Sequence, residues 1–164
     1  MSRNSVAGGA RMRNSCFVAL LLFVAMPTCM AANPPLPGYN PKANPDADLT
    51  RALVDAKTSN KKVLIIAGGD WCVWCHYLES FVKKNKDVDD ALHGAFVTVK
   101  VYMGDENKNT AFFSKLPKAA GYPHFWVIES DGKLKKSMNT GLLEDGKKSY
   151  DKAGFLKFIR DMAS

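Results

Sequence analysis

Residues 63–76, VLIIAGGDWCVWCH, decide the fold of this chain. Residues 63–67 form an uninterrupted apolar run of strand length, which is typical of a central strand covered on both faces. A Gly-Gly-Asp turn ends the run, and the apolar side chains of residues 72–84 then recur at helical spacing. Asp70 is the expected cap of this helix. Two cysteines three residues apart therefore lie where a buried strand gives way to a helix.

This position has a chemical consequence for the cysteine pair. The first turn of a helix presents unpaired backbone N–H groups and the positive end of the helix dipole. A thiolate at Cys72 is favoured there, so we expect its pKa to lie below that of a free cysteine. Cys75 follows nearly one turn later and can close a disulfide with it. The spacing predicts Cys72 as the nucleophile and Cys75 as the resolving thiol.

Three other interpretations of the pair remain open at this stage. Half of a zinc site would need further ligands from His76, His93, His124 or a carboxylate, because the chain has no second closely spaced cysteine pair after residue 32. Residues 72–76 also satisfy the haem attachment pattern, although the strand-to-helix setting argues against haem. A purely structural disulfide would need neither the helix start nor the flanking tryptophan. We expect no metal and no organic cofactor, since the two sulfurs themselves can carry electrons.

The N-terminus has the pattern of a secretory signal peptide. Three arginines lie within the first fifteen residues, an apolar run covers residues 16–26, and small residues follow at Ala31 and Ala32. We expect residues 1–32 to be a signal peptide that exports the protein, to the periplasm, with cleavage after Ala31 or Ala32. A lipid anchor on Cys29 is not expected, because the residues before it match a lipoprotein signal poorly. Cys16 and Cys29 would leave with the peptide, so the mature chain would keep a single cysteine pair.

Charge and composition narrow the class of function. Apolar residues make up 46% and charged residues 24% of the 164 residues, as in ordinary soluble domains. Loss of residues 1–32 removes three of 23 basic residues and none of 16 acidic ones, which lowers the net charge from +7 to +4. This modest, scattered charge argues against nucleic acid as a partner.

The rest of the chain predicts one α/β domain. A Pro-rich linker is expected over residues 33–46 and the domain over 47–164. Helices are expected near 48–57, 88–92, 110–116 and 150–162, and strands near 95–102, 125–128 and 134–138. The last two strands form a hairpin around Asp131 and Gly132. This order predicts a three-layer α/β sandwich, with a central mixed sheet flanked by helices and an N-terminal helix.

The sequence resembles the thioredoxin-like family in two places. Residues 63–75 look like the active-site region of that family, and residues 121–124, GYPH, look like its segment entering the third strand. The resemblance spans about residues 48–162. It is strongest to small exported thioredoxin-like proteins and to the C-terminal domain of the membrane disulfide-interchange reductase. The implied fold is thioredoxin-like.

The resemblance also implies site residues. Pro123 would be a cis proline facing the cysteines, the backbone of Tyr122 would pair with an extended substrate, and Gly141 would border the same groove. Trp71 is expected to offer the substrate a flat apolar contact, and Trp74 to be partly exposed beside it. Two further residues, His76 and Lys100, are expected to modulate the Cys72 thiolate.

One position departs from the family pattern. Thioredoxins keep a buried Asp six residues before the first cysteine, and this chain has Ile66 there. The usual proton acceptor of the resolving cysteine is therefore missing, and Lys100 loses its expected partner. The expected function is a thiol-disulfide oxidoreductase, in the reductase direction. Its partners would be proteins with disulfides and a membrane-bound or soluble thiol-disulfide electron donor. A redox-quiet peptide-binding module and a metal or haem carrier are the alternatives.

Overall fold

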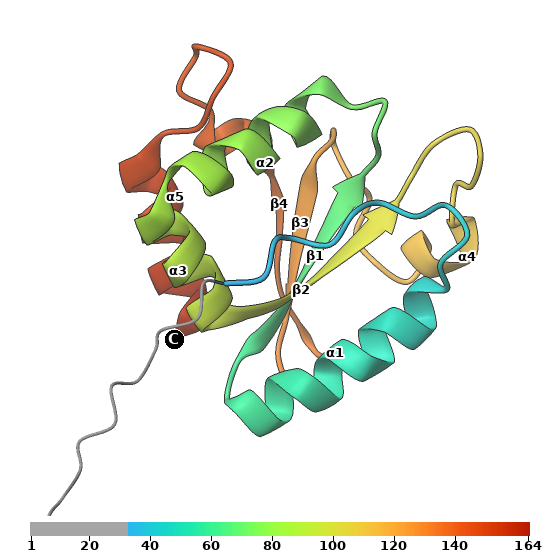
Figure 1. Cartoon of the computed structure of the whole chain (residues 1–164). Coiled ribbons are helices and arrows are strands. Elements are labelled where there is room, and N and C mark those ends of the chain that lie inside the picture. Colours follow the sequence, from blue (N-terminus) through green and yellow to red (C-terminus); the bar gives the residue numbers. More distant parts are fainter. Residues whose placement is uncertain (1–32) are drawn as a thin grey trace, which may run out of the picture. The chain divides into compact units, whose positions relative to one another are not determined.

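The fold is that of a four-stranded mixed sheet, seen in a computed structural model that describes residues 33–164 (Figure 1). The strands are β1 (Lys62–Gly68), β2 (Phe96–Tyr102), β3 (His124–Ile128) and β4 (Leu134–Asn139). Their order across the sheet is β2-β1-β3-β4. β1 pairs parallel with β2 and antiparallel with β3, and β3 pairs antiparallel with β4. The predicted central strand, mixed sheet and terminal hairpin are confirmed.

Helices cover both faces of the sheet. They are α1 (Pro45–Ser59), α2 (Val73–Lys84), α3 (Lys86–Ala95), α4 (Thr110–Phe113) and α5 (Lys152–Ala163), with a 3-10 turn η1 (Thr140–Leu143) after β4. α4 is shorter than predicted and ends before Leu116, because a residue that precedes a proline avoids helical backbone angles. Within residues 33–164, no helix has both the length and the apolar character needed to cross a membrane.

Each face of β1 belongs to its own apolar core. Leu64 and Ile66 pack with α2, α3 and α5, and Val63 and Ile65 pack with α1 and α4. Successive side chains of a strand point to opposite faces, so an uninterrupted apolar run serves two cores at once. β1 is thereby clamped in the middle of the sandwich, and its C-terminal end presents residues 68–72 at one edge of the sheet.

The segment before α1 also lies against this framework. Residues 33–43, which we name the N-terminal strap, carry no regular secondary structure apart from a turn at their end. Leu36 and Tyr39 of the strap pack on the core formed by α2, α3 and α5. The side-chain amide of Asn107 donates to the carbonyl of Pro41 at 2.8 Å. In Figure 1 the strap runs in blue across the sheet to the start of α1.

Candidate redox site

The two cysteines occupy the first turn of α2. Cys72 is the N-cap residue of the helix, and its sulfur accepts a hydrogen bond from the backbone N–H of Cys75 at 3.3 Å. The prediction that Asp70 caps this helix is wrong, because the sulfur itself takes the free N–H group that a capping carboxylate would take. The backbone carbonyl of Asp70 instead contacts the ring Nε2 of His76 at 2.7 Å.

This environment lowers the pKa of Cys72 to about 7. The largest cause is a hydrogen bond from the Cys75 thiol, and burial opposes it. Backbone N–H groups of Cys75 and Trp74 lower the pKa further, and the charge of His76 adds the smallest share. Hydrogen bonds to the charged form favour that form. The predicted acidity of Cys72 thus has two sources, the neighbouring thiol and the helix start.

Cys75 has the opposite character. It is 2% exposed, and its pKa is raised because its proton is held in the hydrogen bond to Cys72 and because the site is buried. Hydrogen bonds from the backbone N–H of Gly69 and from the side chain of Tyr39 work in the other direction and lower it. In the reduced protein, one sulfur is therefore ready to attack while the other keeps its proton.

Two tryptophans flank the pair in different ways. Trp71 is 55% exposed, and its indole N–H donates to the carbonyl of Met103 at 2.7 Å. An added Cβ at Gly104 would lie 2.6 Å from the indole nitrogen, so the glycine leaves room for the ring. Trp74 is half-buried and meets the rings of Tyr77 and Tyr150 edge to face. The indole ring of Trp71 is thus fixed in an exposed position, whereas Trp74 packs partly against the core.

The segment before β3 contains the cis proline that the resemblance implies. The Tyr122–Pro123 peptide bond is cis, and the Thr140 hydroxyl donates to the carbonyl of Pro123 at 2.7 Å. This bond ties η1, which contains Gly141, to the proline. The ring of Tyr122 meets Trp71 edge to face, with centroids 5.8 Å apart. Trp71, Tyr122, Pro123 and η1 therefore form a connected chain of contacts beside α2.

Lys100 has a partner other than the missing carboxylate. Its side chain is 1% exposed and forms an ion pair with Glu79 on α2. Its ammonium also lies 4.7 Å from the centroid of the Tyr39 ring. Ile66, its register neighbour on β1, is buried in the apolar core. The positive charge of Lys100 is thus balanced by Glu79 on α2 rather than by a carboxylate on β1.

Tyr39 is the site residue that sequence reasoning missed. The end of β1 brings it to the cysteines: an added Cβ at Gly68 would collide with the Cys75 sulfur and lie 2.8 Å from the Tyr39 hydroxyl oxygen. Gly68 therefore leaves open the space in which the two groups meet. The only signal in the sequence was a single aromatic residue within a proline-rich stretch, which does not reveal its contact 36 residues away.

His124 belongs to the core. It is 3% exposed, its Nε2 contacts the Ser137 hydroxyl at 2.9 Å, and its ring packs on Trp126 at 4.5 Å. Over residues 33–164, no three His, Cys, Asp or Glu side chains gather in the way a metal site requires. The zinc interpretation finds no further ligands in that part of the chain.

The acidity of Cys72 can be measured by alkylation of the reduced protein with iodoacetamide across pH. The rate at Cys72 should be half-maximal near pH 7, because the thiolate is the reacting form. Cys75→Ala removes the strongest donor and should move the midpoint toward the value of a free cysteine, about 8.5. His76→Gln should raise it less. A wild-type midpoint at the free-cysteine value would contradict the described hydrogen bonding.

Comparison with known proteins agrees with this geometry. Residues 44–130 match the sequence profile of the family described as Thioredoxin-like. No curated protein matches the chain in sequence. A disulphide isomerase from Xylella fastidiosa Temecula1 is 26% identical with a TM-score of 0.66, over 82% of this chain and 100% of that one.

Two further solved structures share the fold. The C-terminal domain of DsbD from Neisseria meningitidis, in its oxidised form, is 16% identical with a TM-score of 0.55, over 73% of this chain and 96% of that one. A putative disulphide-isomerase from Bacteroides thetaiotaomicron is 20% identical with the same TM-score of 0.55, over 79% and 96%. The profile match covers more than half of the chain, and both the sheet order and the implied fold agree with it. The chain belongs to the thioredoxin-like family.

Proposed function

We propose that this protein is an exported thiol-disulfide oxidoreductase that acts on disulfides of other proteins through Cys72 and Cys75. One observation carries the proposal: the Cys72 sulfur caps α2 with a pKa of about 7, and a protonated thiol lies directly behind it. The thiolate is the nucleophile in thiol-disulfide exchange, and an attacking thiol with a pKa near ambient pH is the most effective.

The surface around Cys72 supports a protein substrate. Trp71 and Val73, its neighbours on either side in the chain, are more than half exposed. Exposed apolar side chains beside a reactive group are suited to contact with a polypeptide. We assign Trp71, Trp74, Tyr122, Pro123 and Gly141 to substrate binding, and His76 and Lys100 to modulation of the thiolate.

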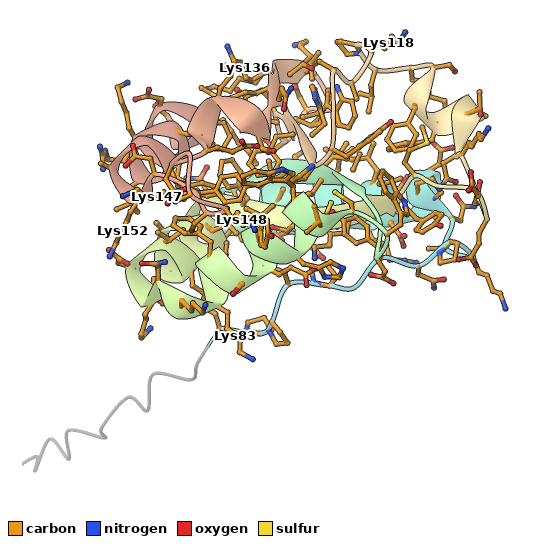
Figure 2. All side chains as sticks on the ribbon, turned by 90° about the horizontal axis from the view of Figure 1, so that it is seen from above. Lys83, Lys118, Lys136, Lys147, Lys148 and Lys152 are labelled. Atoms are coloured by element: carbon orange, nitrogen blue, oxygen red, sulfur yellow. The ribbon has the colours of Figure 1, made fainter. Side chains whose placement is uncertain are left out.

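The charged surface favours no nucleic-acid partner. Figure 2 shows labelled lysines on several sides of the molecule, Lys83 and Lys118 at opposite ends of the view among them. Lys152 is paired with Asp87 at 2.8 Å. Nucleic-acid binding needs positive charge gathered on one face or along one helix. The lysines are better explained as a solvated surface.

Disulfide reduction tests the activity. The protein without residues 1–32 should reduce insulin in the presence of dithiothreitol, and Cys72→Ala should abolish the catalysed rate. Cys75→Ala keeps the attacking sulfur but cannot resolve, so it should accumulate a mixed disulfide that is visible on non-reducing gels. Lys136→Ala, an exposed position far from the chemistry in sequence, serves as the control. A wild-type rate equal to that of Cys72→Ala would refute the activity.

The proposed direction of electron flow is reduction, with a membrane-bound or soluble thiol-disulfide protein as the electron donor. The sequence resemblance to the C-terminal domain of the membrane disulfide-interchange reductase motivates this direction. A reductase is expected to have a potential near that of thioredoxin, about −270 mV. Equilibration of the couple with glutathione measures it. A value near that of a strong oxidant, about −120 mV, would reverse the direction while leaving the exchange chemistry intact.

Export is proposed from the signal-peptide pattern of residues 1–32, which lie outside the described residues. Expressed in full in a Gram-negative host, the protein should reach the periplasmic fraction with an N-terminus at Ala32 or Asn33. N-terminal sequencing of that fraction reads out the cleavage position. A chain that keeps residue 1 and stays in the cytoplasmic fraction would contradict export.

A further inference from the structure

The second half of the exchange reaction makes a specific demand on Cys75. After Cys72 has attacked, it carries the client in a mixed disulfide and is no longer a thiolate. Cys75 must then lose its proton to water, attack the Cys72 sulfur and form the Cys72–Cys75 bond. The bond between Cys72 and the client breaks, and the released client thiolate takes up one proton. The Cys75 thiolate that develops in this step needs a stabilising group.

In the thioredoxins that this chain resembles, a buried Asp six residues before the first cysteine serves the resolving cysteine. This chain has the apolar residue Ile66 at that position. Ile66 is 1% exposed within the core of α2, α3 and α5. The carboxylate of Glu79 is engaged by Lys100. The Tyr150 hydroxyl reaches the carbonyl of Trp74 at 3.4 Å. None of these side chains hydrogen-bonds the Cys75 sulfur.

Tyr39 does reach it. The Cys75 sulfur and the Tyr39 hydroxyl converge on the space left free above Gly68, and the Tyr39 side chain lowers the pKa of the Cys75 thiol in the way that a hydrogen-bond donor does. We propose that the Tyr39 hydroxyl takes the place of the missing carboxylate by donating a hydrogen bond to the Cys75 sulfur while that sulfur resolves the mixed disulfide. This inference rests on the proposed function.

The surroundings of Tyr39 fit a donor rather than a base. Burial is the largest cause that raises the pKa of its hydroxyl, so the proton stays in place at working pH. In the reduced protein, the hydrogen bonds run in one direction, from the Tyr39 hydroxyl to Cys75 and from the Cys75 thiol to the Cys72 thiolate. Once Cys72 is in a mixed disulfide, the bond that held the Cys75 proton is lost. The groups that favour its thiolate, Tyr39 and the N–H of Gly69, remain.

Lys100 strengthens this role. A cation near the face of an aromatic ring is attracted to it, and here the ammonium lies 4.7 Å from the centroid of the Tyr39 ring. This attraction helps to hold the Tyr39 ring against β2, the strand that carries Lys100. Glu79 balances the charge of Lys100, so the buried lysine is not left unpaired.

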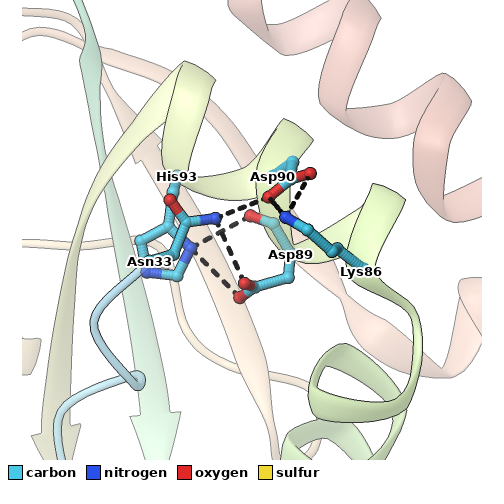
Figure 3. A network of polar contacts seen from close by, with 5 residues as sticks. All are labelled: Asn33, Lys86, Asp89, Asp90 and His93. Atoms are coloured by element: carbon cyan, nitrogen blue, oxygen red, sulfur yellow. Dashed lines mark hydrogen bonds and ion pairs between the residues drawn. The ribbon is translucent and has the colours of Figure 1, made fainter. Parts of the chain in front are cut away.

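Contacts at both ends of the N-terminal strap fix the position of Tyr39 within it. At its start, the side-chain amide of Asn33 donates to Asp89 at 3.1 Å and to Asp90 at 2.9 Å on α3 (Figure 3). Lys86 and His93 hold these two carboxylates in turn. At its other end, Asn107 holds the carbonyl of Pro41. The hydroxyl is thus positioned by the fold and not by a free tail.

The two halves of the reaction can be observed separately with the aromatic disulfide DTNB. Attack by Cys72 on the reagent releases one thionitrobenzoate and leaves a second one bound in a mixed disulfide. Resolution by Cys75 releases the second. Tyr39→Phe removes only the hydroxyl and keeps the ring under Lys100. Loss of a hydrogen bond to a charged group should slow the second release about tenfold or more and leave the first unchanged.

The pH dependence of the second release gives a readout that packing alone would not move. The titratable and charged groups facing Cys75 or its partner Tyr39 are Cys72, Tyr39, Tyr150, Glu79 and Lys100. Of these groups, only Cys72 changes its charge when the mixed disulfide forms. The midpoint should therefore lie higher in Tyr39→Phe than in the wild type. Tyr77→Phe, which removes a hydroxyl from a ring packed on the same core, should match the wild type in both releases.

Three outcomes would decide against the inference or its basis. A second release with wild-type rate and midpoint in Tyr39→Phe would overturn the role of Tyr39 and leave the proposed function standing. Equal slowing of both releases would assign Tyr39 to packing and also overturn it. A wild-type protein that releases no thionitrobenzoate at all would refute the proposed function itself.

Discussion

The chemistry of this site depends on a single proton, which the thiol of Cys75 shares with the sulfur of Cys72. That proton lowers the pKa of one sulfur and raises that of the other. The sharing is possible because β1 ends in glycine and Cys72 is the N-cap of α2, which brings the sulfurs together beyond the C-terminal end of β1. A side chain at position 68 would occupy the space that Cys75 and Tyr39 need. The three layers of the fold hold this small volume in place.

In place of the carboxylate absent from β1, the proposed donor to Cys75 and the ion pair beside it come from three other elements. Glu79 lies on α2, Lys100 on β2 and Tyr39 on the N-terminal strap. A carboxylate can take up a proton, whereas a phenol with a raised pKa can only donate a hydrogen bond. The two solutions differ in where the proton of the resolving thiol goes, to a protein group in one and to water in the other.

The fold was largely predictable because its signals are local. The apolar run of β1, the turn at Asp131 and Gly132 and the periodicity of α5 each depend on neighbouring residues. The cysteine pair was recognisable by spacing, and the cis bond at Pro123 followed from the resemblance. Two local predictions failed where a nearby group competed: the Cys72 sulfur displaced Asp70 as the cap, and Pro117 shortened α4. Tyr39 could not be found in this way, since its contact is fixed only when the strap docks.

The docking of the strap also bears on where this protein begins as a working unit. The family profile starts at residue 44, and every helix and strand of the described residues 33–164 lies beyond that point. A truncated chain cut at the family boundary would retain the cysteine pair and the cis proline, yet it would lack the phenol beside its second sulfur. The segment that sequence similarity defines is therefore shorter at its N-terminal end than the segment that the proposed chemistry requires.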